Sequence, residues 1–140
     1  MKIREMRIEF AWGVEVNAHY KSRIIPTDQP PPKGRGAAPA PFDLFLASIG
    51  TCAGYYVLNF CKQRDLPTND VRIVQWIEID ETSHMVNKIE LEIQVPPSFP
   101  EKYHQALIRS ADQCAVKKHL ENIPQLTTYT KVIKGEGASE

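Results

Sequence analysis

Apolar and polar side chains alternate in two stretches at the start of the chain. In residues 6–12 every second position is apolar, and residues 14–20 repeat this pattern after Trp12 and Gly13. A period of two places the apolar side chains on one face of a strand, and two such runs joined by a short turn are typical of an antiparallel hairpin. The pattern therefore predicts a half-buried hairpin, with strand-like sequence continuing through residues 23–25.

The middle of the chain combines a proline-rich stretch with a long apolar one. Residues 26–40 hold five of the eleven prolines and two glycines, which predicts a loop of the kind that forms lids or binding loops. Residues 41–64 are apolar nearly all round; they begin with Pro41, which suits a first helical turn, and end shortly before Pro67. A helix without a polar face belongs inside a protein. We therefore predict a central helix over residues 41–64.

The second half of the chain repeats the order of hairpin and helix. Residues 71–79 and 89–95 predict a second hairpin, with its turn near residues 81–84. Residues 100–120 carry an apolar helical stripe, and residues 126–133 are rich in the β-branched side chains typical of a strand. Hairpins that alternate with helices predict an α+β fold with mostly antiparallel sheet, in a single domain over the whole chain.

The balance of charge excludes several classes of partner. Lysine and arginine together number 17, as do aspartate and glutamate, so nothing favours nucleic acid or an anionic membrane surface. The charged, alternating N-terminus is unlike a signal peptide. Asp43, Ser48 and Gly50 interrupt the longest apolar run, so we expect no membrane span and a soluble, cytoplasmic protein. Three cysteines in a domain of this size do not suggest a secreted disulfide framework.

The three cysteines differ in their expected positions. Cys52 lies near the middle of the central helix, and Cys61 lies about half a turn out of phase with it. Cys114 lies on the inward stripe of the second helix, so its sulfur can meet that of Cys52 where the two helices pack. A buried cysteine most often only fills space in a core. This simple interpretation applies to each cysteine, and above all to Cys61.

A reactive role for Cys52 would need a positive group nearby. A thiol reacts as its thiolate, and apolar surroundings raise its pKa. Cys52 lies about three turns inside the predicted helix, too far from the N-terminus to benefit from the helix dipole. Arg23, at the end of the second strand, and Arg35, in the proline-rich loop, are the candidate cations. The histidines and cysteines lack the spacing of a zinc site, so we predict neither a metal nor a cofactor.

Two motifs, PAPFDLFLASIGTC at residues 39–52 and ADQCAVKKHL at residues 111–120, resemble the OsmC/Ohr family of thiol peroxidases. The resemblance covers most of the chain. It implies an intertwined homodimer in which two long helices lie at the centre, antiparallel sheets wrap around them and two active sites form at the subunit interface. Phe42 replaces a glutamate that the family carries ten residues before the first cysteine, and Ala115 replaces a common proline. The resemblance is therefore to a divergent, OsmC-like branch.

The resemblance also implies roles for the candidate residues. Cys52 corresponds to the peroxidatic cysteine, whose thiolate attacks the O–O bond of a small organic hydroperoxide, and Cys114 corresponds to the resolving cysteine. A dithiol reductant would then reopen the disulfide. Arg23 and Arg35 are both candidates for the activating arginine, and Asp43 is the acid nearest to the position of the missing glutamate.

A second interpretation belongs to another class of function. The chain would then be a non-catalytic dimeric binding protein that holds an apolar small molecule at the subunit interface, with the cysteines only packing there. Paired cysteines on inward faces favour the enzyme, because a binding protein does not need them.

Overall fold

Along the chain, one antiparallel sheet precedes a long helix and a second antiparallel sheet follows it. The computed structural model describes residues 1–135. The elements are β1 (Arg7–Phe10), β2 (Val16–Tyr20), β3 (Arg23–Thr27), α1 (Pro41–Gln63), β4 (Arg72–Ile79), β5 (Val86–Gln94), the 3-10 turn η1 (Glu101–Tyr103), α2 (His104–Ala111) and α3 (Ala115–Glu121). This arrangement confirms the predicted α+β class.

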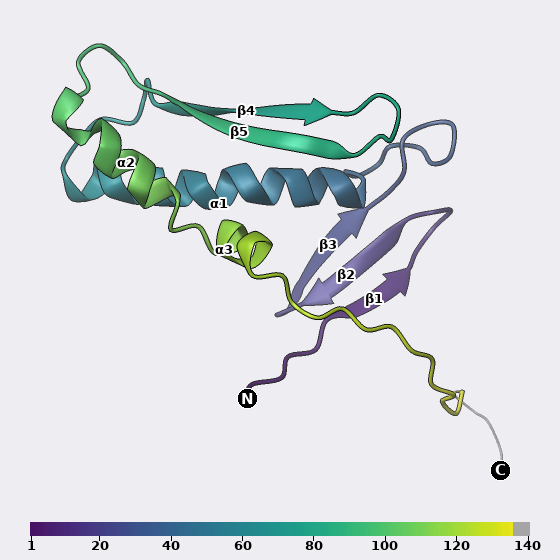
Figure 1. Cartoon of the computed structure of the whole chain (residues 1–140). Coiled ribbons are helices and arrows are strands. Elements are labelled where there is room, and N and C mark those ends of the chain that lie inside the picture. Colours follow the sequence, from purple (N-terminus) through teal and green to yellow (C-terminus); the bar gives the residue numbers. More distant parts are fainter. Residues whose placement is uncertain (136–140) are drawn as a thin grey trace.

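Helix α1 is the axis along which the other elements lie. Pro41 occupies its first turn, and it ends at Gln63, just before Asp65 turns the chain with a positive φ of 52°. In Figure 1 the β4–β5 hairpin runs along one side of α1, α2 crosses in front of the helix, and α3 lies on the side away from the hairpin. The predicted central helix is therefore confirmed to within one residue.

The hydrophobic core forms where α1 meets α2 and the β4–β5 hairpin. Its buried side chains are Ala53, Val57, Phe60, Cys61, Phe99, Leu107 and Ala111. By length and composition alone, α1 is long and apolar enough to cross a membrane, which corrects the expectation that no apolar run reaches that length. Its packing against this core is equally typical of the central helix of a soluble protein.

The first sheet contains a third strand. β2 pairs antiparallel with both β1 and β3, so residues 23–25 return along β2 instead of lengthening it. Lys21 and Ser22 make this turn with positive φ angles of 48° and 60°, as a two-residue hairpin turn requires. The second hairpin, β4–β5, is as predicted.

The predicted helix over residues 100–120 is broken, which corrects the sequence-based expectation. α2 ends at Ala111 and α3 begins at Ala115, because Cys114 has an extended ψ of 126°. The carbonyl of Cys114 already accepts the first hydrogen bond of α3, from Lys118 at 3.1 Å. An apolar stripe reports only the spacing of side chains, and that spacing is compatible with a bend at the cysteine.

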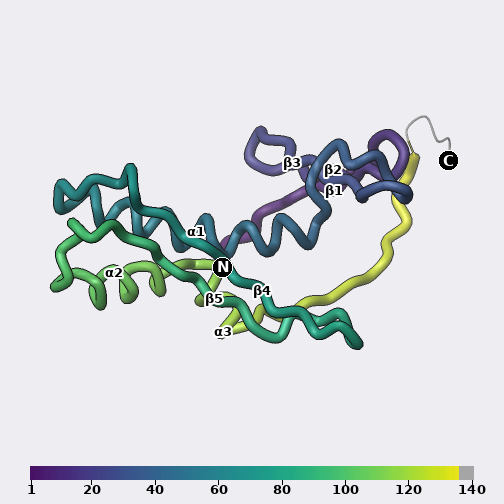
Figure 2. Tube along the Cα trace, turned by 90° about the horizontal axis from the view of Figure 1, so that it is seen from above, coloured from purple at the N-terminus to yellow at the C-terminus, as the bar shows by residue number. Residues whose placement is uncertain are grey.

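The predicted final strand is absent from the described part of the chain. Residues 123–135 have no regular structure, and Leu126, Tyr129 and Val132 are 88%, 83% and 98% exposed. In Figure 2 this segment runs away from α3 and β5. A β-branched sequence forms a strand only where another strand offers its edge. Within the described residues no strand pairs with 126–133.

The proline-rich loop between β3 and α1 closes around Asp28. This residue is 1% exposed, and its carboxylate accepts the amides of Ala37 at 2.9 Å and Gln29 at 2.8 Å. These hydrogen bonds, that from Ala37 first, hold the pKa of Asp28 below its ordinary value. A Cβ at Gly34 would lie 2.6 Å from Asp28 Oδ1, so only glycine fits there.

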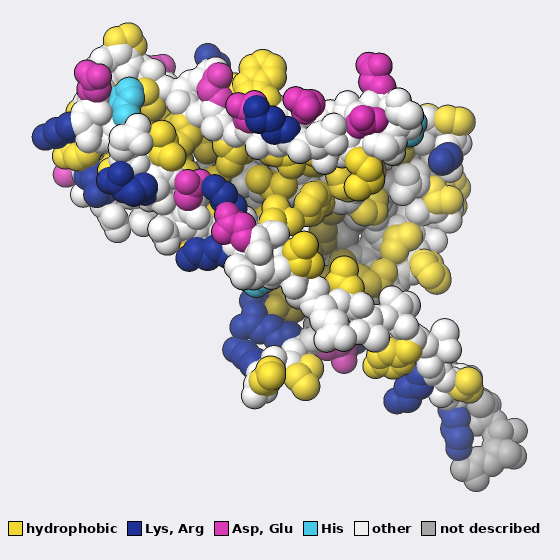
Figure 3. Space-filling model, in the orientation of Figure 1, with side chains coloured by type: hydrophobic (Ala, Val, Ile, Leu, Met, Phe, Trp, Pro, Cys, Tyr) yellow, Lys and Arg dark blue, Asp and Glu magenta, His cyan; other side chains and the backbone are white. Residues whose placement is uncertain are grey.

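A large apolar surface remains open on the described chain. Ile8, Phe10 and Trp12 are 59%, 89% and 68% exposed. Figure 2 shows the β1–β3 sheet set apart from β4–β5 and α2, and Figure 3 shows apolar side chains gathered in the hollow below the β4–β5 hairpin. Monomeric soluble proteins rarely expose contiguous apolar surface of this kind.

Candidate active site

The thiols of Cys52 and Cys114 meet where α3 begins. Cys52 lies on α1 and is half-buried, whereas Cys114 lies between α2 and α3 with 1% of its surface exposed. Both α2 and α3 contact α1, which brings the two cysteines together. The two thiols lie close enough for Cys114, as a hydrogen-bond donor, to lower the pKa of Cys52. The structure thus joins the two cysteines that the sequence placed on inward-facing positions.

Backbone amides of α3 surround the same two sulfur atoms. The first turn of any helix leaves N–H groups without partners inside the helix. Here the amide of Lys117 donates to Cys114 Sγ at 3.4 Å, and the nearby amides of Val116 and Ala115 lower the pKa of the Cys52 thiol. The start of α3 therefore offers the hydrogen bonds that stabilise a thiolate.

The pKa values of the two thiols move in opposite directions. The amide of Val116, the thiol of Cys114 and the amide of Ala115 lower the pKa of Cys52, against the opposing effect of burial. Burial and the hydrogen bond to Cys52 raise the pKa of Cys114. Because a bond to the charged form favours ionisation, Cys52 loses its proton first while Cys114 stays protonated as its donor. This is the division that an attacking and a resolving cysteine require.

The two candidate arginines lie elsewhere in this chain. Arg35 forms an ion pair with Glu15 at 2.9 Å, and its guanidinium lies 4.4 Å from the ring centre of Trp12. Arg23 lies at the start of β3, beside Lys21 in a polar cleft. Among the described residues, the groups that lower the pKa of Cys52 belong to the start of α3. Sequence reasoning missed these amides because it treated residues 100–120 as one helix, whose interior amides would all be bonded.

Asp43 lies in the first turn of α1, where its negative charge interacts favourably with the positive end of the helix dipole. At 1.5 Å per residue it stands roughly 13 Å along the helix from Cys52. Phe42, which replaces the family glutamate, is instead part of an aromatic pair with Phe45, with ring centres 5.4 Å apart.

Cys61 is separate from the reactive pair. It is fully buried in the hydrophobic core between α1, α2 and the β4–β5 hairpin, and burial raises its pKa. Both features fit a space-filling thiol. Among the described residues, no group of three or more His, Cys, Asp or Glu side chains could hold a metal ion.

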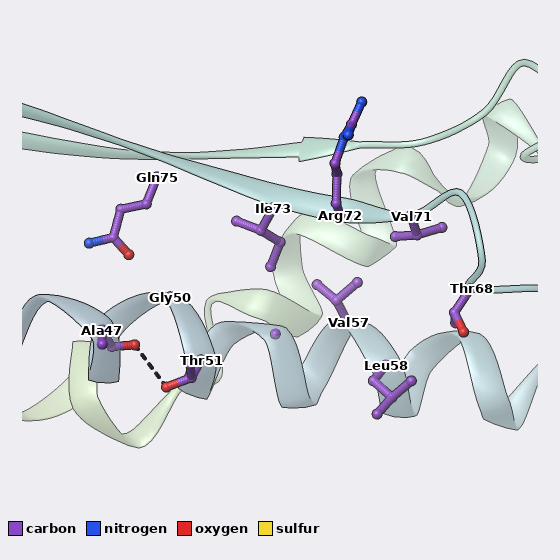
Figure 4. Close-up of a pocket in the computed structure, with 11 residues that line it drawn as sticks. Ala47, Gly50, Thr51, Val57, Leu58, Thr68, Val71, Arg72, Ile73 and Gln75 are labelled. Atoms are coloured by element: carbon purple, nitrogen blue, oxygen red, sulfur yellow. Dashed lines mark hydrogen bonds between the residues drawn. The ribbon is translucent and has the colours of Figure 1, made fainter. Parts of the chain in front are cut away.

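A groove of about 410 Å³ lies between α1 and β4 (Figure 4). Its walls are Ala47, Gly50, Thr51, Gly54, Val57, Leu58, Thr68, Val71, Arg72, Ile73 and Gln75. Gln75 points toward α1 and donates to the carbonyl of Leu46 at 3.0 Å, whereas Arg72 points away from the helix. At about 100° per residue, Cys52 faces away from the direction of Gly50 and Gly54. The groove and the thiol pair therefore occupy opposite sides of α1.

Comparisons with known proteins agree on one family. The sequence model of the family described as OsmC-like protein matches residues 34–128. No curated protein matches the sequence.

Among solved structures, an OsmC like protein from Mycoplasma pneumoniae has a TM-score of 0.66 at 12% identity, over 87% of this chain and 89% of that one. An osmotic stress induced and detoxification response protein from Psychrobacter arcticus 273-4 has a TM-score of 0.66 at 16% identity, over 84% and 88%. An organic hydroperoxide resistance protein OsmC from Legionella pneumophila has a TM-score of 0.50 at 14% identity, over 86% and 91%. At such identities the likeness is one of fold.

Proposed function

Because the chain belongs to the OsmC-like protein family, we propose that it reduces small organic hydroperoxides, with Cys52 as the peroxidatic cysteine and Cys114 as the resolving cysteine. The observation that carries the proposal is the contact between the two thiols, in which Cys52 is the stronger acid and Cys114 the hydrogen-bond donor. The Legionella protein of similar fold is described as conferring organic hydroperoxide resistance, which agrees with this choice of substrate.

The proposed reaction has two steps. The thiolate of Cys52 attacks one peroxide oxygen, the O–O bond breaks, and the alcohol leaves after taking up a proton, so that Cys52 becomes a sulfenic acid. The thiol of Cys114 then attacks the sulfenic sulfur and releases water, and a disulfide forms. An external dithiol reductant returns both cysteines to thiols. Such chemistry suits a reducing compartment such as the cytoplasm.

Three further residues keep proposed roles in this site. Arg23 and Arg35 are candidate cations that would add to the effect of the α3 amides on Cys52. Asp43, at the start of α1, is the candidate acid near the position of the family glutamate. The amides already lower the pKa of Cys52 within this chain, so an arginine would strengthen the acidity of Cys52 rather than create it.

We further propose that the protein acts as a homodimer. Exposed apolar side chains on β1 and on residues 123–135 need a partner, and the β-branched C-terminal segment needs a strand edge. A second copy of the chain supplies both. The thiol pair would then lie near the subunit interface, because Phe45 and Tyr55, which are 39% and 61% exposed, lie toward the same side of α1 as Cys52.

A non-catalytic binding function is the second candidate. The groove between α1 and β4 is mostly apolar and large enough for a small molecule, and it lies away from the thiols. If this function were the main one, the cysteines would be dispensable.

The test is the consumption of cumene hydroperoxide in the presence of dithiothreitol. We expect the wild type and Cys61→Ser, the matched control, to consume it and Cys52→Ser to be inactive. Cys114→Ser should accumulate a sulfenic acid at Cys52 that dimedone traps. Equal consumption by the wild type and Cys52→Ser would rule out the proposed enzymatic function and favour the binding function.

A further inference from the structure

A polar cleft of about 400 Å³ lies at the turn between β2 and β3 and contains neither cysteine of the thiol pair. Its walls are Glu5, Arg7, His19, Lys21, Ser22, Arg23 and Ile24. Figure 3 shows lysine and arginine side chains gathered in the lower part of the molecule, where Figure 1 draws the start of the chain. The cleft is as large as the sites in which proteins hold small molecules.

All three strands of the first sheet contribute to the positive charge of this cleft. Arg7 on β1 lies opposite His19 on β2 in the register of the two strands. Lys21 follows β2 in the tight turn, and Arg23 begins β3. The hairpin turn therefore brings two cations of the chain beside a third that arrives from a separate strand.

Carboxylates neutralise only part of this charge. Glu9 contacts both Arg7, at 3.7 Å from Nε, and His19, at 3.1 Å from Nε2. Neither Lys21 nor Arg23 forms an ion pair with any residue between positions 1 and 135. Positive groups that lie together without such partners repel each other and attract anions from solution. The cleft thus offers cations to an anionic ligand.

The cleft also remains open in the homodimer proposed above. Side chains alternate between the two faces of a strand, so Arg7 and His19 lie on one face of the sheet. Ile8 and its register partner Ala18 lie on the other face, together with Phe10. That apolar face is the one assigned to the second copy of the chain, and the cations face away from it.

We propose that this cleft binds a dianionic phosphate group, either free phosphate or the phosphate of a small ester. One arginine can satisfy a carboxylate alone, whereas a phosphate presents several oxygens and nearly two charges to several donors at once. Arg7, Lys21 and Arg23 supply three such donors from different directions, and Ser22 adds a hydroxyl. The inference goes beyond the hydroperoxide reaction and does not depend on it.

The experiment is a titration of the reduced full chain, followed by NMR of its backbone amides. The probes are glycerol phosphate, inorganic phosphate and, as a monoanion, acetate, all at one ionic strength because salt screens exposed charges. We expect both phosphates to shift the amides of residues 19–24 until they saturate, and acetate to leave them nearly unchanged. Amides of β4 and β5 are the internal control. The tighter of the two phosphates identifies the source of the group.

Substitutions then test which side chains hold the anion. Arg7→Gln and Lys21→Gln should each raise the dissociation constant of the tighter phosphate roughly fivefold, as for the loss of one exposed charge pair. Lys88→Gln, which removes a positive charge from β5, is the matched control and should bind as the wild type does. Neither Arg7 nor Lys21 has a role in the proposed reaction, so both variants should consume cumene hydroperoxide normally.

Three results would overturn the inference. The first is a shift of residues 19–24 that grows with phosphate without saturating, because that is the effect of bulk salt. The second is acetate binding as tightly as phosphate. The third is an unchanged dissociation constant in either Arg7→Gln or Lys21→Gln. None of them concerns the hydroperoxide reaction, which the comparison with Cys52→Ser tests separately.

Discussion

The pKa values of the neighbouring thiols of Cys52 and Cys114 move apart: the amide of Val116 and a hydrogen bond from Cys114 lower that of Cys52, whereas burial and the same bond raise that of Cys114. The bond favours the thiolate of its acceptor and the neutral form of its donor. In the proposed reaction, Cys114 would thus help to ionise the cysteine that it later joins.

This relationship predicts the pH dependence of alkylation. The rate at which iodoacetamide modifies Cys52 should rise with a midpoint below the ordinary thiol pKa, about 8.5, and that of Cys114 with a midpoint above it. In Cys114→Ala the midpoint of Cys52 should move up, because one donor is lost. In urea both cysteines should share one midpoint. Identical midpoints in the folded protein would contradict the assignment.

The arginine variants test which groups make Cys52 acidic. We expect the pKa of Cys52 to stay below its ordinary value in both Arg23→Gln and Arg35→Gln, because the amides of α3 remain. The alkylation midpoint measures this directly. Lys33→Gln, which changes a nearby charge of the proline-rich loop, is the control. A return of Cys52 to its ordinary pKa in either arginine variant would identify that arginine as the main cause.

The buried position of Cys61 predicts an effect on stability without an effect on activity. Cys61→Ser places a hydroxyl in the core and should cost about 1–3 kcal/mol in the free energy of unfolding. Burial raises the pKa of Cys61, so its stabilising contribution is complete below the ordinary thiol pKa and is lost as pH rises through the raised value. The free energy of unfolding, measured with urea, should fall more steeply between pH 7 and pH 10 for the wild type than for Cys61→Ala. Parallel curves would show that Cys61 is not the group responsible.

Asp28 predicts the opposite dependence on pH. Its pKa is lowered by the amides of Ala37 and Gln29, so its contribution to stability is present above the ordinary carboxyl pKa and is lost as pH falls through the lowered value. Asp28→Asn should therefore be less stable than the wild type at pH 7, and the difference should shrink in strong acid. Thermal unfolding at several pH values measures this. A difference independent of pH would mean that the carboxylate charge is unimportant.

The exposed apolar face of the first sheet predicts the state of association. We expect sedimentation equilibrium to give the mass of two chains and Phe10→Glu to shift it toward one, because a charge would be buried in the interface. Glu9→Gln changes the neighbouring side chain on the opposite face of β1 and should leave the mass unchanged. A wild-type protein that sediments with the mass of one chain would rule out the proposed homodimer.

The sequence was most informative where structure depends on local spacing. The apolar run after Pro41 predicted α1 to within one residue, and alternation predicted β1–β2 and β4–β5. The third strand was less evident because Lys21 and Ser22 lack the glycine or asparagine that usually marks such a turn.

Features that depend on distant contacts could not be predicted. The bend lies at Cys114, whose own side chain accepts the amide of Lys117, and cysteine is not among the residues that usually mark the start of a helix in a sequence. The sequence placed Cys52 and Cys114 on inward-facing sides of their helices, and it therefore predicted that the two could meet. The C-terminal segment has the composition of a strand, but among residues 1–135 no strand pairs with it.

The opposite placement of the groove and the thiols on α1 has a kinetic consequence. A helix with its side chains is about 10 Å across, so a molecule lying against Gly50 and Gly54 cannot touch the sulfur of Cys52. In the proposed reaction, compounds that fill the groove should therefore not compete with the hydroperoxide. Inhibitors found by screening would fall into two classes that bind simultaneously.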